Sequence, residues 1–137
     1  MTFENSIFAK QLNFKKISLS FGNFYLLDNF TIAEINEGIH LDWNKIEELI
    51  NHLVLHYGED IRIGYLTNRV NSYSIEPQSW IKFEKEYGFI VASAIVVYND
   101  FAFINATLEK QFAKSSIKRC NSLDQAISWM QNLKEFK

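Results

Sequence analysis

Apolar and polar positions alternate along residues 16–36, in the two-residue period that is typical of half-buried strands. The alternating runs are KISLSF (16–21), FYLLD (24–28) and FTIAEIN (30–36). Gly22 and Asn23 separate the first two runs, and such a pair supplies the positive φ angles that a two-residue hairpin needs. This pattern predicts an antiparallel meander.

After residue 40, apolar residues recur at helical spacing in four segments. Asp42 is expected to cap the first helix and Gly58 to end it, whereas Pro77 is expected to start the second. Asn99 and Ser122 are the expected caps of the third and fourth helices. The apolar positions along the four helices are Ile46, Leu49, Ile50, Leu53, Val54 and Tyr57; Trp80, Phe83 and Tyr87; Phe103, Ile104, Leu108 and Phe112; and Ala126, Ile127, Trp129, Met130 and Leu133.

Three further apolar runs lie between these helices, at 61–66, 93–98 and 117–120. Strands that alternate with helices imply right-handed crossovers and a mostly parallel sheet. The expected fold class is therefore α/β, with an N-terminal antiparallel meander that leads into a mostly parallel central sheet with about four helices. Residues 16–137 are expected to form a single domain, and residues 1–15, which show no clean period, an N-terminal arm.

Composition narrows the class of protein. Of the 137 residues, 47% are apolar and 15% aromatic, which favours a well-packed globule over intrinsic disorder. The net charge of -2 gives no broad basic surface, so binding to nucleic acid is not expected. No apolar run approaches the ~18 residues of a membrane span, and the first residues lack the apolar core of a secretory signal. We expect a cytoplasmic protein of bacterial type without an integral membrane segment.

Side chains that carry chemistry are sparse. Cys120 is the only cysteine, so neither an intramolecular disulfide nor a thiolate metal site is expected. His52 and His56 stand four residues apart, a spacing that can bind a metal, but no third ligand is evident. The sequence holds no nucleophile elbow, Walker loop or dinucleotide fingerprint. We therefore expect no enzyme activity, no cofactor and no metal.

One segment stands out as a candidate site. Residues 67–76, TNRVNSYSIE, are mostly polar and follow the expected strand at 61–66. In a parallel sheet, ligands bind at the carboxyl ends of the strands, where a helix N-terminus offers free N–H groups to an anion. A plainer interpretation is a turn whose side chains satisfy its own backbone. The candidate interaction residues are Arg69, Asn71, Ser72, Tyr73, Ser74 and Trp80.

These candidates have different expected roles. Arg69 is expected to contribute charge and Trp80 an apolar anchor, while the hydroxyl and amide side chains of the loop supply hydrogen bonds. A phosphate on Ser72 or Ser74 would lie near the positive end of the second helix. Arg69 would then meet that phosphate in charge-assisted hydrogen bonds.

Two stretches resemble a known family. VASAIVVYND (91–100) resembles a strand of small and β-branched residues followed by asparagine, and IKRCNSLDQAISWMQNL (117–133) resembles a closing strand, capped turn and helix. Both are features of the STAS, or SpoIIAA-like, family of anti-sigma-factor antagonists, and the order of elements extends the resemblance over about residues 16–134. The resemblance is closest to the stand-alone bacterial members. It implies a SpoIIAA-like fold.

The resemblance also implies a function. In the signalling members, the loop that corresponds to residues 67–76 carries an Asp-Ser pair whose serine is phosphorylated and whose surface meets a kinase or another partner. The nearest pair here is Asn71-Ser72, with Ser74 two residues later. The chain is accordingly expected to be a non-enzymatic protein-interaction or regulatory module that acts through the 67–76 loop, with a protein partner such as a kinase or regulatory protein, and as a homodimer.

The alternative function belongs to another class. Related folds hold a lipid or another apolar small molecule, so the chain is alternatively a carrier or sensor with an aromatic-rich cavity that involves Phe101, Phe103 and Phe112. A continuous apolar cavity of some hundreds of cubic ångströms would favour this alternative, and a tightly packed interior would count against it.

Overall fold

The computed structural model of the chain describes residues 1–113 and 116–136 and has an α/β architecture built on one large sheet. The strands of this sheet are Lys15–Leu19 (β1), Gly22–Leu26 (β2), Phe30–Ile35 (β3), Ile63–Asn68 (β5), Ile90–Val96 (β7) and Ser116–Cys120 (β8). Their spatial order is β1-β2-β3-β5-β7-β8. β1, β2 and β3 pair antiparallel, and β3, β5, β7 and β8 pair parallel. The predicted meander and the mostly parallel sheet are confirmed.

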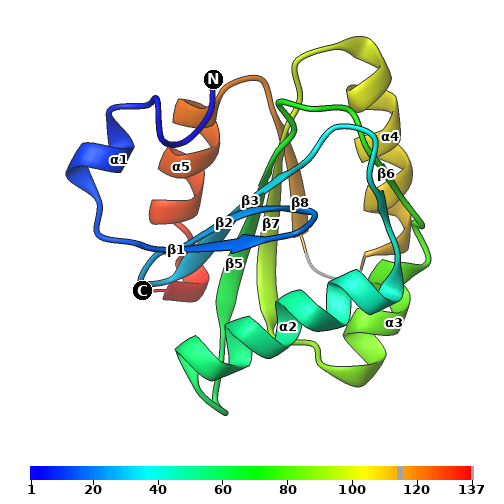
Figure 1. Cartoon of the computed structure of the whole chain (residues 1–137), viewed down its shortest axis with the longest axis horizontal. Coiled ribbons are helices and arrows are strands. Elements are labelled where there is room, and N and C mark those ends of the chain that lie inside the picture. Colours follow the sequence, from blue (N-terminus) through cyan, green and yellow to red (C-terminus); the bar gives the residue numbers. More distant parts are fainter. Residues whose placement is uncertain (114–115, 137) are drawn as a thin grey trace.

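Helices cover both faces of this sheet. α1 (Phe8–Gln11) and α5 (Leu123–Gln131) lie on one face, and α2 (Trp43–Tyr57), α3 (Ser79–Glu86) and α4 (Asp100–Phe112) lie on the other (Figure 1). A turn of 3₁₀ helix, Lys134–Phe136, follows α5, and a separate parallel pair joins β4 (His40–Leu41) to β6 (Ser74–Ile75). The four predicted helices are present. Within the described part of the chain, no helix is both long and apolar enough to cross a membrane.

Three helices begin at the residues that the sequence marks as caps. Asp42, Asn99 and Ser122 each accept a hydrogen bond from the backbone N–H three residues later, at 3.0, 2.8 and 3.1 Å. These bonds satisfy N–H groups that have no partner within the first turn of a helix. The predicted starts of α2, α4 and α5 are therefore confirmed together with their cause.

The turn between β1 and β2 differs from the prediction. Leu19 pairs directly with Gly22, so the two turn residues are Ser20 and Phe21 instead of the glycine–asparagine pair. Gly22 lies within β2 and has no positive φ angle. A β-carbon at Gly22 would come within 2.6 Å of the backbone oxygen of Glu34. The glycine is required by the close approach of β3, not by the turn.

Alternate residues of the central strands pack against different helices. Ile32 of β3 joins the cluster that includes α5, whereas the next residue, Ala33, joins the cluster that includes α2. α5 comes so close to β5 that a β-carbon at Gly64 would overlap Sδ of Met130. Gly64 therefore lets α5 lie directly on the sheet.

α4 presents a different side to the sheet from the one that its apolar spacing indicates. Its buried positions are Ala106 and Glu109. Four of its large apolar side chains point to solvent instead: Phe101, Phe103, Ile104 and Leu108 are 69, 41, 60 and 45% exposed. α4 packs through Ala106 and Glu109, with Ala102 and Phe112 partly buried beside them, and the four exposed apolar residues remain available at the surface.

The first fourteen residues, which include α1, lie against the side of the sheet that α5 covers. Phe3 is fully buried, with its ring centroid 5.1 Å from that of Phe14 and 4.8 Å from that of Tyr25. α1 has no fully buried residue, but Phe8 and Ala9 are partly buried and pack against the same cluster. Phe3 is thus the main apolar anchor of the segment.

β1 and β8 form the two margins of the large sheet. Lys15 and Lys16 are exposed on β1, and Lys118 and Arg119 are half-buried on β8. Positive side chains on a marginal strand oppose the addition of another strand. Arg119 also donates a hydrogen bond to Oγ1 of Thr107 at 2.7 Å, which ties β8 to α4.

Candidate functional site

The 67–76 segment emerges at the carboxyl edge of the parallel strands, where the sequence places it. β5 runs parallel to both β3 and β7, and Thr67 and Asn68 still belong to β5. Beyond them the chain turns, pairs with β4 through β6 and then enters α3 (Figure 1). Thr67, Asn68 and Arg69 are buried, whereas Ser72 and Ser74 are exposed. Only the outer part of the segment is therefore open to solvent.

Arg69 turns inward, which corrects the expectation that it offers its charge at the surface. Its side chain is 8% exposed, and Nη2 lies 2.6 Å from Oε2 of Glu109 in α4. Its guanidinium carbon lies 5.2 Å from the centroid of the Tyr73 ring. Burial alone would lower the pKa of Arg69, but Tyr73 and Glu109 raise that pKa, so the guanidinium stays charged. Burial also raises the pKa of Tyr73 to about 12. Arg69 is thus paired with the carboxylate of Glu109, whereas the sequence predicted that it would pair with a phosphate on the loop.

Trp80 also lies inside, so the prediction of a surface anchor at this position is wrong. It is 7% exposed, and its Nε1 donates a hydrogen bond to Oε1 of Glu109 at 3.1 Å. Its ring belongs to the cluster that contains Ile95 and Ala106. Glu109 is 1% exposed and contacts both Arg69 and Trp80. One buried carboxylate therefore joins the 67–76 segment, α3 and α4.

The outer part of the loop, residues 70–76, is held by hydrogen bonds to the end of β3 and to the chain that follows it. Nδ2 of Asn71 donates to the backbone oxygen of Ile35 at 3.1 Å. The N–H of Ser72 donates to Oε2 of Glu37 at 2.8 Å, and its backbone oxygen accepts from the N–H of Gly38 at 2.8 Å. Asn71 therefore satisfies neighbouring backbone, in line with the plainer interpretation, while the hydroxyl of Ser72 faces solvent.

Ser74 has a partner that the sequence did not indicate. Its Oγ lies 2.7 Å from Nδ1 of His40, because β4 and β6 place these two residues opposite each other. A histidine beside a hydroxyl forms half of a nucleophilic arrangement, which also needs a group that orients the imidazole. Among the described residues, no such hydrogen bond to the second ring nitrogen is present. The contact is best described as a link between two exposed side chains.

The start of α3 offers less to an anion than the sequence indicates. The helix begins at Ser79, two residues after Pro77. The N–H groups of Ser79, Trp80 and Ile81 already donate to the carbonyls three residues earlier, at 2.9, 3.2 and 3.1 Å. The expectation of free N–H groups that receive a phosphate is therefore wrong at this helix.

The exposed apolar side of α4 lies next to the outer loop. A crevice of about 20 Å³ between them is lined by Asn71, Ser72, Tyr73, Phe101, Ala102 and Asn105, among others. Phe101 is 69% exposed at the rim of this crevice, and Ile104 is 60% exposed one turn farther along the helix. Polar loop groups and large apolar side chains thus share one surface.

The apolar cavity found in the interior of the described part of the chain is smaller than the alternative function needs. An apolar cavity of about 60 Å³ lies between α2, α3 and the sheet and is lined by Leu49, Leu53 and Phe83, among others. Pockets that hold small molecules usually measure about 300–1,000 Å³. Phe101 and Phe103 are exposed, so they do not enclose a cavity as expected. These observations do not favour a lipid carrier.

The described residues show no evident centre for metal or thiol chemistry. Among residues 1–113 and 116–136, no three His, Cys, Asp or Glu side chains gather closely enough to hold a metal ion. Cys120 is fully buried in β8, and burial raises the pKa of its thiol. A buried thiol with a raised pKa is a poor nucleophile.

A second polar cluster lies at the same edge, on the side of the sheet that faces α5. Oε2 of Glu34 accepts hydrogen bonds from the N–H of Phe3 at 2.8 Å and from Nδ2 of Asn68 at 2.7 Å. The hydroxyl of Tyr98 donates to Oδ1 of Asn68 at 2.6 Å. Glu34 is 6% exposed, and burial raises its pKa although both hydrogen bonds lower it. The sequence could have indicated this cluster, because Glu34 shares the two-residue alternation of Phe30 and Ile32, which face the core.

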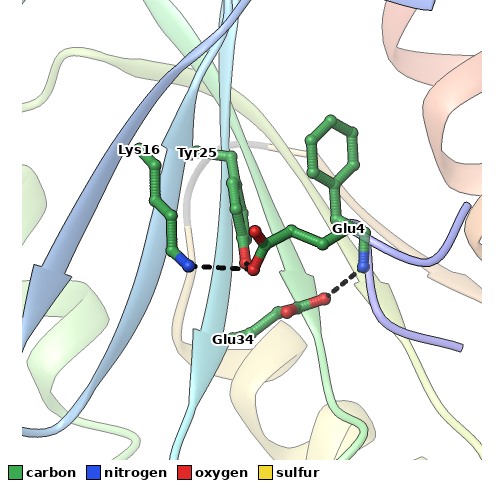
Figure 2. A network of polar contacts seen from close by, with 5 residues as sticks. Glu4, Lys16, Tyr25 and Glu34 are labelled. Atoms are coloured by element: carbon green, nitrogen blue, oxygen red, sulfur yellow. Dashed lines mark hydrogen bonds and ion pairs between the residues drawn. The ribbon is translucent and has the colours of Figure 1, made fainter. Parts of the chain in front are cut away.

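Glu4 extends this cluster toward β1 and β2. Figure 2 shows its carboxylate between Lys16 and Tyr25, with Glu34 nearby. Oε2 of Glu4 accepts hydrogen bonds from the Tyr25 hydroxyl at 2.7 Å and from Nζ of Lys16 at 2.9 Å, and these contacts lower the pKa of Glu4. The segment before β1 is therefore held by polar contacts as well as by the Phe3 ring.

Comparison with known proteins supports a fold and no particular activity. No protein-family model matches the sequence, and no curated protein is significantly similar to it. Among solved structures, the chain is similar to the crystal structure of an uncharacterized protein of the DUF3478 family from Shewanella loihica PV-4, which has a SpoIIAA-like fold. The TM-score is 0.51 at 12% sequence identity, and the match covers 87% of this chain and 93% of that one. The chain therefore has a SpoIIAA-like fold, as the resemblance in its sequence implies.

Proposed function

We propose that the chain is a non-enzymatic, cytoplasmic protein-interaction or regulatory module of STAS-like type. Its binding surface consists of the outer part of the 67–76 loop and the exposed side of α4. The observation that carries this proposal is the position of Ser72 in solvent beside Phe101, on a loop whose base is anchored inside the molecule. Ser74 is also exposed, two residues farther along the same loop.

The anchored base favours binding. Arg69 fixes the start of the loop to Glu109, and β6 fixes its end to β4. A surface that is already ordered loses less conformational entropy when a partner binds than a mobile one does. The loop therefore presents its two serines in a defined position.

The exposed side of α4 supplies the apolar part of the surface. Phe101, Ile104 and Leu108 are 69, 60 and 45% exposed and follow one another along the helix. Contiguous apolar patches on soluble proteins commonly mark sites of protein interaction. Large apolar side chains at the centre of an interface also tend to carry most of its binding energy.

The partner that fits this surface is another protein, such as a kinase or a regulatory protein. Phosphorylation of Ser72 or Ser74 would add about two negative charges beside an apolar surface and so change its affinity. Arg69 is already paired with Glu109, so the phosphate acts through the new surface charge, and at Ser74 through His40. Asn71 and Tyr73 support the loop from beneath.

A second copy of the chain is also a fitting partner for the apolar side of α4. Two helices related by a twofold axis bury the same side chains from each copy. Sedimentation equilibrium measures this dimer directly. Ile104→Asp is expected to weaken it, because the new charge would be buried without a partner; an unchanged dimer would place the contact elsewhere.

Affinity capture from extract of the native host tests the interaction surface. Phe101→Asp and Ile104→Asp are expected to lose the captured protein, because each places a charge where an apolar contact forms. Leu55→Asp is the matched control. Leu55 is 83% exposed, and it lies on α2, which belongs to neither part of the proposed surface. Capture that persists in both α4 variants, or that is equally lost in the control, counts against the surface.

Intact-mass measurement tests the modification separately. Protein isolated from the host is expected to carry additional phosphate that is lost in Ser72→Ala or Ser74→Ala. The unmodified mass under all growth conditions would exclude the phosphorylated form of the proposal and leave the interaction surface to the capture experiment.

A further inference from the structure

Three polar side chains at the carboxyl edge converge on one place that the proposed surface does not use. Glu34 lies in β3, Asn68 ends β5, and Tyr98 follows β7. These are neighbouring parallel strands, and the side chains lie on the side of α5, whereas Arg69 lies on the side of α4. The carboxyl edge of an open α/β sheet is where ligands usually bind.

The group that these side chains hold is a stretch of peptide backbone. Oε2 of Glu34 accepts from the N–H of Phe3 at 2.8 Å, and Nδ2 of Asn68 donates to the backbone oxygen of Met1 at 2.9 Å. The Tyr98 hydroxyl lies 3.3 Å from the same oxygen and 2.6 Å from Oδ1 of Asn68. An acceptor for one N–H and a donor for a carbonyl two residues earlier hold a short peptide backbone at two points, just before a turn in which the N–H of Ser6 donates to the oxygen of Phe3 at 3.0 Å.

Two side chains of the bound segment are recognised as well. Phe3 is 0% exposed, and its ring packs against Phe14 and Tyr25. The next residue, Glu4, places its carboxylate between Lys16 and the Tyr25 hydroxyl, at 2.9 and 2.7 Å (Figure 2). The site thus selects an aromatic side chain followed by an acid.

The occupant adds to the hydrogen bonds that join Glu34, Asn68 and Tyr98 to one another. Glu34 and Asn68 are 6 and 1% exposed, and buried polar groups cost free energy unless they are hydrogen-bonded. Residues 1–4 are anchored by Phe3, by Glu4 and by the backbone of Met1, whereas the residues that follow pack on the core through Phe8, Ala9, Leu12 and Phe14. Local opening of residues 1–4 alone would leave that packing and the sheet in place.

We propose that Glu34, Asn68 and Tyr98 form a binding site for a short peptide in which an aromatic residue is followed by an acid. Residues 1–4 are its resident and exchangeable occupant. This site does not rest on the proposed surface of the loop and α4, since it lies on the other side of the sheet. Because the resident segment closes the site, the apparent affinity for an added peptide equals the intrinsic affinity multiplied by the fraction of molecules whose site is open.

The direct test uses the full chain and a synthetic peptide of residues 1–8 with a fluorophore at its C-terminal end. Phe3→Ala loosens the resident segment and leaves the site intact, so it is expected to bind the peptide about ten-fold or more tightly than the unchanged chain. Adding Asn68→Ala removes the donor for the peptide carbonyl and is expected to reverse that gain. A peptide in which alanine replaces its phenylalanine is the matched control and is expected not to bind.

Glu4→Lys provides the same test without a change in the core. The Glu4 side chain is 48% exposed, and a lysine there repels Lys16, so this variant is expected to bind the peptide more tightly by a smaller factor. If both variants are folded by circular dichroism and neither binds better than the unchanged chain, the proposal is overturned. Binding that is insensitive to Asn68→Ala overturns it too. Phe101→Asp should leave peptide binding unchanged, which separates this site from the surface on α4.

Discussion

Arg69 and Glu109 form an ion pair beneath the loop, with 2.6 Å between Nη2 and Oε2 and with both side chains almost fully buried. The pair joins the end of β5 to α4, and Trp80 adds α3 through its hydrogen bond to the same carboxylate. The loop is thus held from inside the molecule. Its outward groups, Ser72 and Ser74, depend on this buried link for their position.

Replacement of Glu109 by glutamine tests the energy of that link. Glu109→Gln is expected to lower the free energy of unfolding by about 3–5 kcal/mol, because Arg69 keeps its charge in a buried site without a counter-charge. Arg69→Met combined with Glu109→Leu is expected to be less destabilised, since both charges are gone. Urea unfolding followed by circular dichroism measures both variants. A double variant less stable than Glu109→Gln would contradict this account.

Gly64→Ala tests the close packing of α5 on β5. The added β-carbon would overlap Sδ of Met130, so the variant is expected to lose about 1–3 kcal/mol of unfolding free energy. Combining it with Met130→Ala frees the space, and the double variant is expected to lose less than the sum of the two single losses. Thermal unfolding of the four proteins gives the comparison, and strict additivity would argue against the contact.

Ser122→Ala tests the cap of α5. Loss of the hydrogen bond from Ser122 Oγ to the N–H of Gln125 is expected to cost about 1 kcal/mol. Ser128 lies on the exposed side of the same helix, and Ser128→Ala is expected to change stability by less than about 0.5 kcal/mol. Urea midpoints measured side by side distinguish the two, and equal effects would speak against the cap.

The pKa of Glu34 predicts a dependence of stability on pH. Burial raises this pKa above its usual 4.5, so the folded chain binds the proton more tightly than the unfolded chain does. The contribution of Glu34 to stability is therefore fully present below pH 4.5 and is lost as the pH rises through the folded pKa. Compared with Glu34→Gln, the unchanged chain is expected to lose stability from pH 4.5 upward.

Urea unfolding of both proteins over a series of pH values measures this difference. Comparison with the glutamine variant is needed because Glu4 has a lowered pKa and its contribution has the opposite dependence on pH. A difference that is constant, or that grows in favour of the unchanged chain as the pH rises, would refute the assignment.

Features that depend on neighbouring residues could be predicted from the sequence. Asp42, Asn99 and Ser122 each need only the N–H three residues later, so the cap and its partner lie in the same short stretch. The hairpin was misplaced because its position depends on pairing across strands, where Leu19 meets Gly22. Gly22 is required by the structure, but the reason is the close approach of β3 and not the geometry of the turn.

The location of the candidate site could also be predicted, but the direction of its side chains could not. Arg69 continues the two-residue alternation of Tyr65 and Thr67, which points toward the helices on that face, yet its partner Glu109 lies far along the chain. For the same reason the apolar spacing of α4 was misleading. A polar residue such as Glu109 is buried only when a distant charge compensates it.

The lysines on the marginal strands have a consequence for the behaviour of many copies together. Lys15 on β1 and Lys118 on β8 place positive charge at the two margins, and Lys16 adds less because it pairs with Glu4. Two molecules that approach margin to margin therefore repel each other before their strands can template a growing fibril. Concentrated salt screens these charges and would therefore weaken the protection of both margins.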